Sequence, residues 1–281
     1  MTVQIKAGHE IFVVDNASTD GSQAMVSQDF PDVKLLESPE NLGFAAANNL
    51  AMRVCQGDYI LLLNSDTRVL PGALGAMVSF MDQNPQTGAC GSRLLNPDGS
   101  LQFSCSPEPK LHTEFNRLFH LGGIRPDGYY NMEGWDLSEP RQVDVVLGAC
   151  LMIRRESMQA VGLMDEDYFM YSEEVDYCKR LKDVGWKICW IPKAQVIHYG
   201  GQSTRQAATK MFICLYQGKV KYFRKHYGGF HALLYKFILF GAGLFRIALV
   251  PLAWLGSSTK RESYLTLANN YGRLLLSLPG L

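Results

Sequence analysis

Three groups of polar side chains in this sequence have the types and spacing needed to handle a phosphorylated substrate. The first is Asn64-Ser65-Asp66, which directly follows the apolar run at 59–63. The others are an acidic cluster, Glu173, Glu174 and Asp176, and a single histidine, His198. A carboxylate at the end of a buried strand can hold Mg²⁺ or Mn²⁺ against phosphate oxygens. Clustered carboxylates in a partly dry pocket can supply a general base.

Each group also has a simpler structural interpretation. Asp66 would equally serve to cap the helix expected from about Pro71. Acids at 173–176 suit the positive end of a helix dipole, although the aromatic residues around them, in YFMYSEEVDY, favour a partly dry pocket. A lone histidine more often belongs to a core or a surface than to a metal site. The residues alone leave these alternatives open.

The elements that position these groups alternate between strand and helix. Short apolar runs at 11–14, 33–38 and 59–64 predict strands, and the stretches at 43–55 and from about 71 predict helices. Such alternation is typical of an α/β fold with a mostly parallel sheet, whose ligands bind at the carboxyl ends of the strands. Asp15 and Asp66 both follow strands, so we expect them to face one crevice.

Later segments follow a different pattern. An Asn-Pro-Asp-Gly turn at 96–99 predicts a hairpin, and the apolar run at 143–155 predicts a strand interrupted by Gly148 and Ala149. Ser172 is the expected N-cap of a helix that ends near Gly185. Two short strands are expected around Pro192, ending at His198.

Composition and charge restrict the class of protein. Apolar residues make up 47% and charged residues 19%, which excludes a disordered chain or a coiled coil. Residues 1–205 hold 17 Lys/Arg and 26 Asp/Glu, whereas residues 206–281 hold 10 and 1. This asymmetry argues against a nucleic-acid-binding body. The seven cysteines, several of them in apolar runs, indicate core thiols in a reducing compartment, and no signal peptide is visible at the N-terminus.

Six segments together resemble one family. They are VVDNASTDGS, NLGFAAANN, LLLNSD, GACLMIRR, DYFMYSEEVDYCKRL and VIHYGGQS. In order and spacing they are similar to the inverting, nucleotide-sugar-dependent family two glycosyltransferases of GT-A type, and most similar to bacterial rhamnosyltransferases. The resemblance covers about residues 11–205 and implies a Rossmann-like, mostly parallel sheet flanked by helices.

The resemblance also assigns roles to residues. It implies that Asp15, Asn41, Gly43, Asn48, Asn64 and Ser65 bind the donor, and that Asp66 and His198 hold a divalent metal, Mg²⁺ or Mn²⁺. Glu174 matches the family's catalytic base, usually an aspartate, so Glu173 and Asp176 remain rivals. Gly148 and Ala149 would leave room for the acceptor. Trp186, Trp190 or Tyr171 would stack on a sugar, although such aromatic residues more often pack in a core. The implied reaction is inverting transfer, for instance from dTDP-L-rhamnose, to a cell-envelope glycan or lipid-linked acceptor.

The two ends of the chain differ from the sequence pattern of that family. About thirty residues that form the first βα unit in relatives have no counterpart before residue 11, so a truncated reading frame is expected for the domain at 1–205. Residues 206–281 form a basic, apolar tail in which Lys236 and Arg246 interrupt a stretch long enough to span a bilayer. Amphipathic helices lying on the cytoplasmic leaflet fit this pattern best, ahead of a tilted span or a helical cap.

Two other classes of function remain. A catalytically impaired remnant that only binds a membrane or partners would follow from a missing first strand. A nucleotidyltransferase would also use carboxylates and a metal, but the glycine-rich phosphate loop typical of that class is not visible. Nucleic acid is not an expected partner of this protein.

Overall fold

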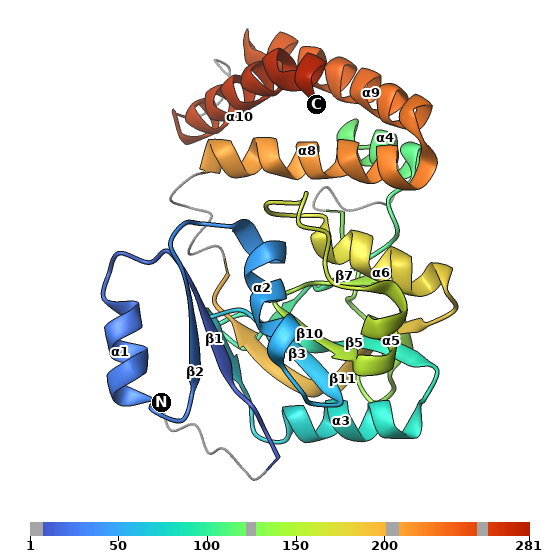
Figure 1. Cartoon of the computed structure of the whole chain (residues 1–281). Helices are drawn as coiled ribbons and strands as arrows, with labels where there is room; N and C mark the ends of the chain where they lie inside the picture. The colour runs from blue at the N-terminus through green and yellow to red at the C-terminus, as the bar shows by residue number, and fades with distance from the viewer. Residues whose placement is uncertain (1–7, 122–127, 201–207, 252–257) are drawn as a thin grey trace. The chain divides into compact units, whose positions relative to one another are not determined.

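The computed structural model describes residues 8–121, 128–200, 208–251 and 258–281 (Figure 1). The chain divides into two compact units. The first lies within residues 1–108 and 132–200, and the second within 109–131 and 201–281. The boundary expected at 205/206 lies outside the described residues. The second unit also includes the earlier stretch 109–131, which the charge pattern did not single out.

The first unit contains a seven-stranded mixed sheet with the path β3–β10–β5–β11–β4, to which β6 adds beside β5 and β8 beside β11. Two separate two-stranded sheets are the parallel β1–β2 and the antiparallel β7–β9. Strand β10 is antiparallel to both β3 and β5, and β5 is parallel to β11, so β3, β5 and β11 run in the same direction. The strands are β1 (Phe12–Asn16), β2 (Lys34–Ser38), β3 (Tyr59–Leu63), β4 (Thr67–Val69), β5 (Thr87–Leu95), β6 (Leu101–Gln102), β7 (Cys105–Ser106), β8 (Arg141–Gln142), β9 (Val145–Val146), β10 (Cys150–Arg154) and β11 (Lys187–His198).

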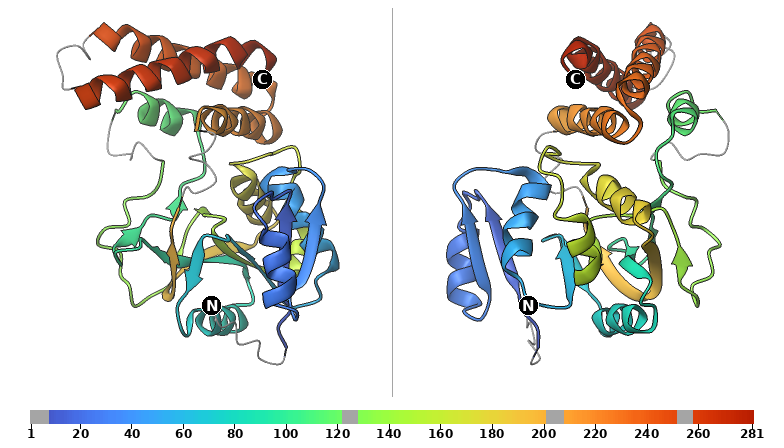
Figure 2. Two further views of the ribbon diagram at one scale, coloured as in Figure 1. Left: turned by 90° about the vertical axis from the view of Figure 1, so that its left-hand side faces the viewer. Right: turned by 45° about the vertical axis from the view of Figure 1, so that its right-hand side comes forward.

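Helices pack against the large sheet and against β1–β2, which confirms the α/β class expected from the sequence. Helix α1 lies beside β2, and α3 lies along the large sheet (Figures 1 and 2). Met77 and Met81 of α3 are fully buried against strand residues that include Cys90 and Val196. The helices are α1 (Ser22–Asp29), α2 (Gly43–Val54), α3 (Ala73–Gln83), α5 (Arg155–Val161) and α6 (Glu173–Asp183).

Most of the local elements follow the predictions. The turn at 96–99 joins β5 to β6 as an antiparallel hairpin, and Gly99 has the left-handed φ of +84° that the turn requires. The segment at 143–155 is split into β9 and β10 around Gly148 and Ala149. The expectation of two strands around Pro192 is wrong, because β11 runs unbroken from Lys187 to His198. A register shift between Ile191 and Gln195 accommodates the proline, which cannot donate a ladder hydrogen bond.

The cysteines have the structural role that the sequence indicates. All seven are free thiols. Cys90, Cys150 and Cys189 are buried in the sheet core, whereas Cys55 and Cys214 are only half-buried. Burial raises the pKa of the Cys178 thiol to about 12, so this side chain is a neutral, apolar core group.

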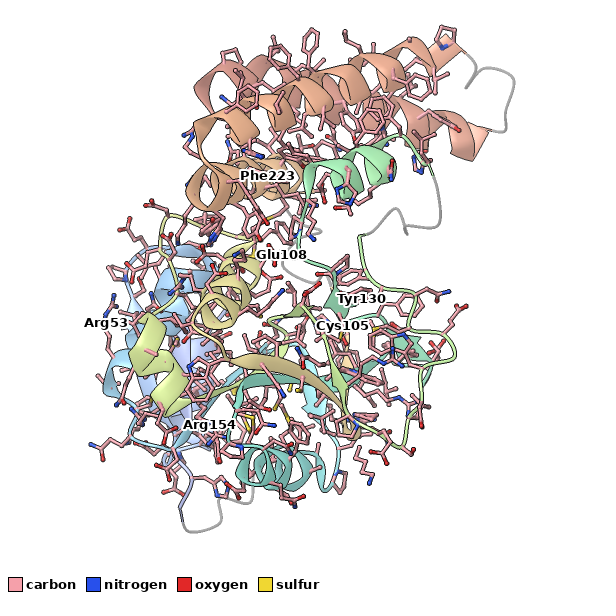
Figure 3. The ribbon with its side chains drawn as sticks, turned by 90° about the vertical axis from the view of Figure 1, so that its right-hand side faces the viewer. Arg53, Cys105, Glu108, Tyr130, Arg154 and Phe223 are labelled. Carbon is pink, nitrogen blue, oxygen red and sulfur yellow. The ribbon has the colours of Figure 1, made fainter. Side chains whose placement is uncertain are left out.

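The second unit is helical. Its helices are α4 (Leu111–Leu118), α8 (Ala208–Tyr227), α9 (Gly229–Ala248) and α10 (Ser258–Ser277), followed by the 3₁₀ turn η2 (Leu278–Gly280). Buried aromatic and aliphatic side chains from α8, α9 and α10 form its core, among them Phe223, labelled in Figure 3. In the described part of the chain, Gly229–Ala248 is the one helix with the length and apolar character to cross a membrane.

Candidate functional site

The carboxyl edge of the large sheet brings Asp66 and His198 together. Asp66 lies in the turn between β3 and β4, and His198 ends β11 in register with Thr67 of β4. The Tyr199 backbone N–H donates to the Asp66 carbonyl at 2.9 Å, so the two segments are joined directly. His198 Nε2 lies 3.3 Å from Asp66 Oδ1, and both side chains are mostly buried.

The helix-capping alternative for Asp66 is not supported. Helix α3 begins at Ala73, and its N-cap is Gly72, with no side chain bonded to the helix start. The turn that carries Asp66 is held by other contacts, since Thr67 Oγ1 donates to the Asn64 carbonyl at 2.7 Å. The carboxylate therefore remains directed to His198 rather than to the helix.

Gln102, which the sequence reasoning missed, determines how His198 faces Asp66. Its Nε2 donates to Asn96 Oδ1 at 3.1 Å and to the His198 carbonyl at 3.3 Å. Its Oε1 therefore faces His198 Nδ1, at 2.7 Å, and that nitrogen must carry the hydrogen. In the neutral ring, Nε2 then presents a lone pair to the Asp66 carboxylate.

This pair is suited to a cation. The carboxylate oxygen and the imidazole nitrogen are both electron-rich and lie 3.3 Å apart, so a positive charge bound between them would be attracted to both. A carboxylate oxygen and an imidazole nitrogen also fit the donor set of a divalent ion such as Mn²⁺. Among the described residues, no group of three or more His, Cys, Asp or Glu side chains is arranged so that it could hold a metal ion. An ion here would take its remaining ligands from substrate phosphates and water, as Mg²⁺ commonly does.

The start of α6 separates its three acids into different environments. Tyr171 and Ser172 both have left-handed φ angles, 68° and 72°, which turn the chain sharply into the helix. Ser172 occupies the predicted N-cap position, but it acts through its carbonyl, which accepts from the Asp176 N–H at 2.8 Å, and not through its side chain.

Asp176 is fully buried and has a structural partner. Its Oδ2 accepts from Arg180 Nε at 2.8 Å. The same guanidinium donates to the carbonyls of Val161 and Leu163. This ion pair ties α6 to the end of α5 and favours a structural role for Asp176 over that of a base.

Glu173 and Glu174 are neighbouring carboxyls in unequal surroundings. Burial, and after it the charge on Glu174, raises the pKa of Glu173 well above its ordinary value. Glu174 is half-buried and faces the small residue predicted for the acceptor. A Cβ added to Gly148 would lie 3.8 Å from the Glu174 Cβ and 3.3 Å from the Phe44 ring. Glu174, Gly148 and the start of α2 therefore adjoin.

The predicted donor residues Asn41 and Gly43 are tied to the end of β1 by Asn16, a second residue that the sequence reasoning missed. Asn16 Nδ2 donates to Asn41 Oδ1 at 3.1 Å and to the Gly43 carbonyl at 3.2 Å. Gly43 has a φ of +82°, and an added Cβ would overlap the carbonyl oxygen of Phe169. Asn48 Nδ2 donates within its own helix, to the Phe44 carbonyl at 2.8 Å.

Asp15 organises the loop after β1. Its Oδ2 accepts from the Ser18 N–H at 3.0 Å and from Gln23 Nε2 at 2.7 Å. A hydrogen bond from the Ser18 side chain is the main cause that lowers the pKa of Asp15. An open pocket of about 440 Å³ adjoins this loop and is lined by residues 17–19, Gln23 and residues 37–39. A pocket of this size is large enough for a small ligand.

The remaining predicted residues divide between the two edges of the sheet. Asn64 is half-buried and Ser65 exposed beside Asp66. Ala149 is buried, and its carbonyl accepts from the Asn64 N–H at 3.0 Å, so it supports the turn rather than opening space for an acceptor. Trp186 precedes β11 and packs over Gly88, at the opposite edge from His198. The structure therefore does not bring Trp186 into the site, because the direction of β11 separates the two residues.

Arg154 shows how that opposite edge is occupied. It ends β10, and its guanidinium donates to the carbonyls of Thr87, Met81 and Asn84 (Figure 3). These contacts fasten the end of α3 to the start of β5. The edge away from Asp66 is thus closed by structural hydrogen bonds.

Comparisons with known proteins identify the family. Residues 4–162 match the family model described as Glycosyl transferase family 2. The chain is 32% identical over 209 residues to an N-acetylglucosaminyl-diphospho-decaprenol L-rhamnosyltransferase of Mycobacterium tuberculosis, covering 69% of this chain and 67% of that protein. It is 26% identical over 182 residues to a rhamnosyltransferase of Escherichia coli K12, covering 60% and 66%.

Solved structures with a similar fold include one with a bound donor and metal. It is a mannosyltransferase from Pyrobaculum calidifontis in complex with GDP-Man and Mn²⁺, with a TM-score of 0.56 and 19% identity, covering 96% of this chain and 76% of that chain. At this identity the likeness concerns the fold alone. It supports the GT-A type of α/β architecture expected from the sequence.

Proposed function

Because the chain belongs to glycosyl transferase family 2 and is a nucleotide-sugar-dependent glycosyltransferase, we propose that it transfers L-rhamnose, with inversion, from dTDP-L-rhamnose to a cell-envelope acceptor. The observation that carries the proposal is the pair formed by Asp66 Oδ1 and His198 Nε2, 3.3 Å apart at the carboxyl edge of the sheet. The sugar is inferred from two relatives named as rhamnosyltransferases.

Glu174 is the proposed general base. Its carboxylate takes the proton from an acceptor hydroxyl, whose oxygen bonds to the anomeric carbon on the face opposite the leaving group. The bond from that carbon to the diphosphate oxygen breaks at the same time, and the nucleoside diphosphate leaves with the electron pair. The different surroundings of the two carboxyls support this assignment, since burial raises the pKa of Glu173 whereas Glu174 is half-buried beside Gly148.

Asp66 and His198 would hold Mg²⁺ or Mn²⁺, which supplies charge neutralisation for the diphosphate when bound. Asn64 and Ser65 adjoin this pair. Asn41, Gly43 and Asn48 lie just before and within the first half of α2. Asp15 accepts hydrogen bonds from Ser18 and Gln23, which line the pocket of about 440 Å³. We assign the nucleoside to that pocket. Gly148 lies beside Glu174 and would leave the acceptor space to approach.

The acceptor is proposed to be a lipid-linked glycan. The Mycobacterium tuberculosis relative is named for a diphospho-decaprenol acceptor. An acceptor of this kind would keep the protein at the cytoplasmic leaflet of the cell membrane, where the basic helical unit would meet anionic lipid.

Turnover by the purified protein tests the proposal. With dTDP-L-rhamnose, Mn²⁺ and a lipid-linked acceptor, wild-type protein should release dTDP and glycosylate the acceptor. Asp66→Ala and Glu174→Gln should each reduce turnover by about 10²–10⁴-fold. Glu156→Gln is the matched control, because Glu156 is an exposed acid in the first turn of α5, and it should retain full activity.

The opposite results are equally specific. Full activity of Asp66→Ala or Glu174→Gln would refute the assigned roles. A wild-type protein that binds the nucleotide but never turns over would instead indicate a catalytically impaired binding protein.

A further inference from the structure

The outer face of α9 carries a continuous apolar row. Five side chains recur at spacings of three and four residues and lie on one side of the helix. Each is 48–69% exposed in the described structure. The row consists of Phe230, Leu233, Phe237, Phe240 and Leu244.

The inner face of the same helix is already occupied. Tyr235 and Leu239 are fully buried, and they belong to one core with Val220 of α8 and Leu274 of α10. The exposed row is thus not the core side of a helix that is loosely packed. It is a second apolar face that none of the described residues covers.

We propose that this row is a membrane-docking surface, on which α9 lies in the plane of an anionic bilayer with its five apolar side chains below the headgroups. This row would be the surface through which the proposed glycosyltransferase contacts the membrane. Only the biological reason for that contact rests on the proposed function. An amphipathic helix buries such a face at the boundary between headgroups and acyl chains.

The packing of α9 favours a helix lying on the bilayer over one that spans it. α8 and α10 pack along its inner face and would have to enter the hydrocarbon with it. α8 carries the exposed Lys221, Arg224 and Lys225, and α10 carries the exposed Arg273, so insertion would bury several charges. An in-plane position buries the outer row and leaves those helices in water.

The charge of the helices identifies the kind of surface. Residues 206–281 hold ten Lys/Arg and one acid, Glu262. Lys236 directly precedes Phe237, which places it about 100° around the helix, at the border of the apolar row. A lysine there can extend its ammonium group to lipid phosphates while its stem follows the apolar side chains. This combination fits an anionic lipid surface.

Vesicle sedimentation tests the surface without any donor or acceptor. The full chain should bind vesicles of phosphatidylglycerol and phosphatidylcholine, and should bind vesicles of phosphatidylcholine alone more weakly. Phe237→Gln combined with Phe240→Gln should weaken binding by at least about tenfold. Lys236→Gln should reduce the preference for the anionic vesicles and the sensitivity of binding to salt.

Matched controls separate this proposal from the enzymatic one. Met25→Gln combined with Val54→Gln removes two exposed apolar side chains from the first unit and should leave vesicle binding unchanged. The α9 double variant should keep wild-type circular dichroism and wild-type release of dTDP from the donor in solution. A protein without turnover can therefore still bind vesicles, and a protein that does not bind vesicles can still turn over its donor. The two proposals can fail independently.

Three outcomes would overturn the inference. The first is a wild-type chain that binds neither kind of vesicle. The second is a double variant that binds as tightly as wild type. The third is a concentration-dependent dimer that the double variant abolishes while vesicle binding persists, which would make the row an interface between two copies.

Discussion

Hydrogen bonds to one amide determine what Asp66 and His198 can hold. Gln102 accepts from His198 Nδ1 and is itself fixed by Asn96, in the turn of the hairpin. The ring therefore presents Nε2 to the carboxylate, in the tautomer that a metal ligand requires. Gln102 acts on this pair through His198, so it is a positioning residue.

Substitution Gln102→Leu should release the orientation of His198. We expect Mn²⁺ affinity in the presence of dTDP to fall by about 10–100-fold, because partners of metal-bound histidines have effects of this size. Titration calorimetry of the metal measures this without turnover. Gln83→Leu, at an exposed glutamine of α3, should leave the affinity unchanged. Equal Mn²⁺ affinity in Gln102→Leu and wild type would show that Gln102 has no positioning role.

The sequence could predict the residues at the ends of strands but not their supports. Asp66 and His198 follow apolar runs, so their positions come from the strand pattern and the family resemblance. Gln102 and Asn16 act through hydrogen bonds between segments distant in sequence, and no local pattern marks such pairs. Trp186 was misplaced for a related reason: an aromatic residue beside a strand does not reveal which edge of the sheet it occupies.

At the level of elements, the entry to α2 depends on close backbone approach. Gly43 begins the helix with a φ of +82°, and its Cα faces the carbonyl of Phe169 in the loop before α6. The Phe44 N–H donates to the same carbonyl at 2.8 Å. This contact joins the predicted donor segment to the segment that carries Glu174.

Gly43→Ala should break that junction. An added Cβ meets backbone, which cannot move aside as a flexible side chain can, and the φ is unfavourable for alanine. We expect a loss of about 1–3 kcal/mol in the free energy of unfolding of the first unit. Gly75→Ala is the control, since Gly75 is exposed in α3 with open space around it, and it should stabilise the protein by about 0.5–1 kcal/mol. Denaturant titration of both variants tests the difference, and equal stabilities would contradict it.

Element types were predictable wherever the hydrophobic period was clear. The strands at 12–16 and 59–63 and the helix at 43–54 lie within two residues of their expected bounds. The break expected at Pro192 did not occur, because neighbouring strands on both sides hold β11 in place through a register shift. Pairing partners in a mixed sheet are set by tertiary packing, which explains why the antiparallel placement of β10 was not foreseen.

At the scale of the whole molecule, the two units are stabilised differently. The first has a sheet core of apolar side chains and an ion pair of the buried Asp176 with Arg180, whereas the helical unit buries a network of several charged side chains around Glu114. Glu114 of α4 accepts from Arg117 at 2.7 Å, from Lys219 of α8 at 2.7 Å and from the Tyr235 hydroxyl of α9 at 3.1 Å. The network joins α4, which lies in sequence between the two segments of the first unit, to helices near the C-terminus.

The charge of Glu114 should contribute to stability in a defined pH range. Burial alone would raise the pKa of Glu114, but Lys219 and Arg117 outweigh it and lower the pKa to about 2. A carboxyl whose pKa is lower in the folded state stabilises that state fully above its unfolded pKa, near 4.5. The contribution is lost as the pH falls from about 4.5 towards 2.

Glu114→Gln should therefore destabilise the helical unit and leave the first unit intact. Removal of one partner from a buried ion pair costs about 3–5 kcal/mol, because Arg117 and Lys219 keep buried charge without a counter-ion. Hydrogen exchange of amides in α8 and α9 should accelerate at pH 7, while amides of β5 and β11 keep wild-type rates. The difference from wild type should shrink as the pH is lowered from about 4.5. Glu262→Gln, at an exposed acid of α10, should change neither unit, and equal acceleration in both units would contradict their separate stabilisation.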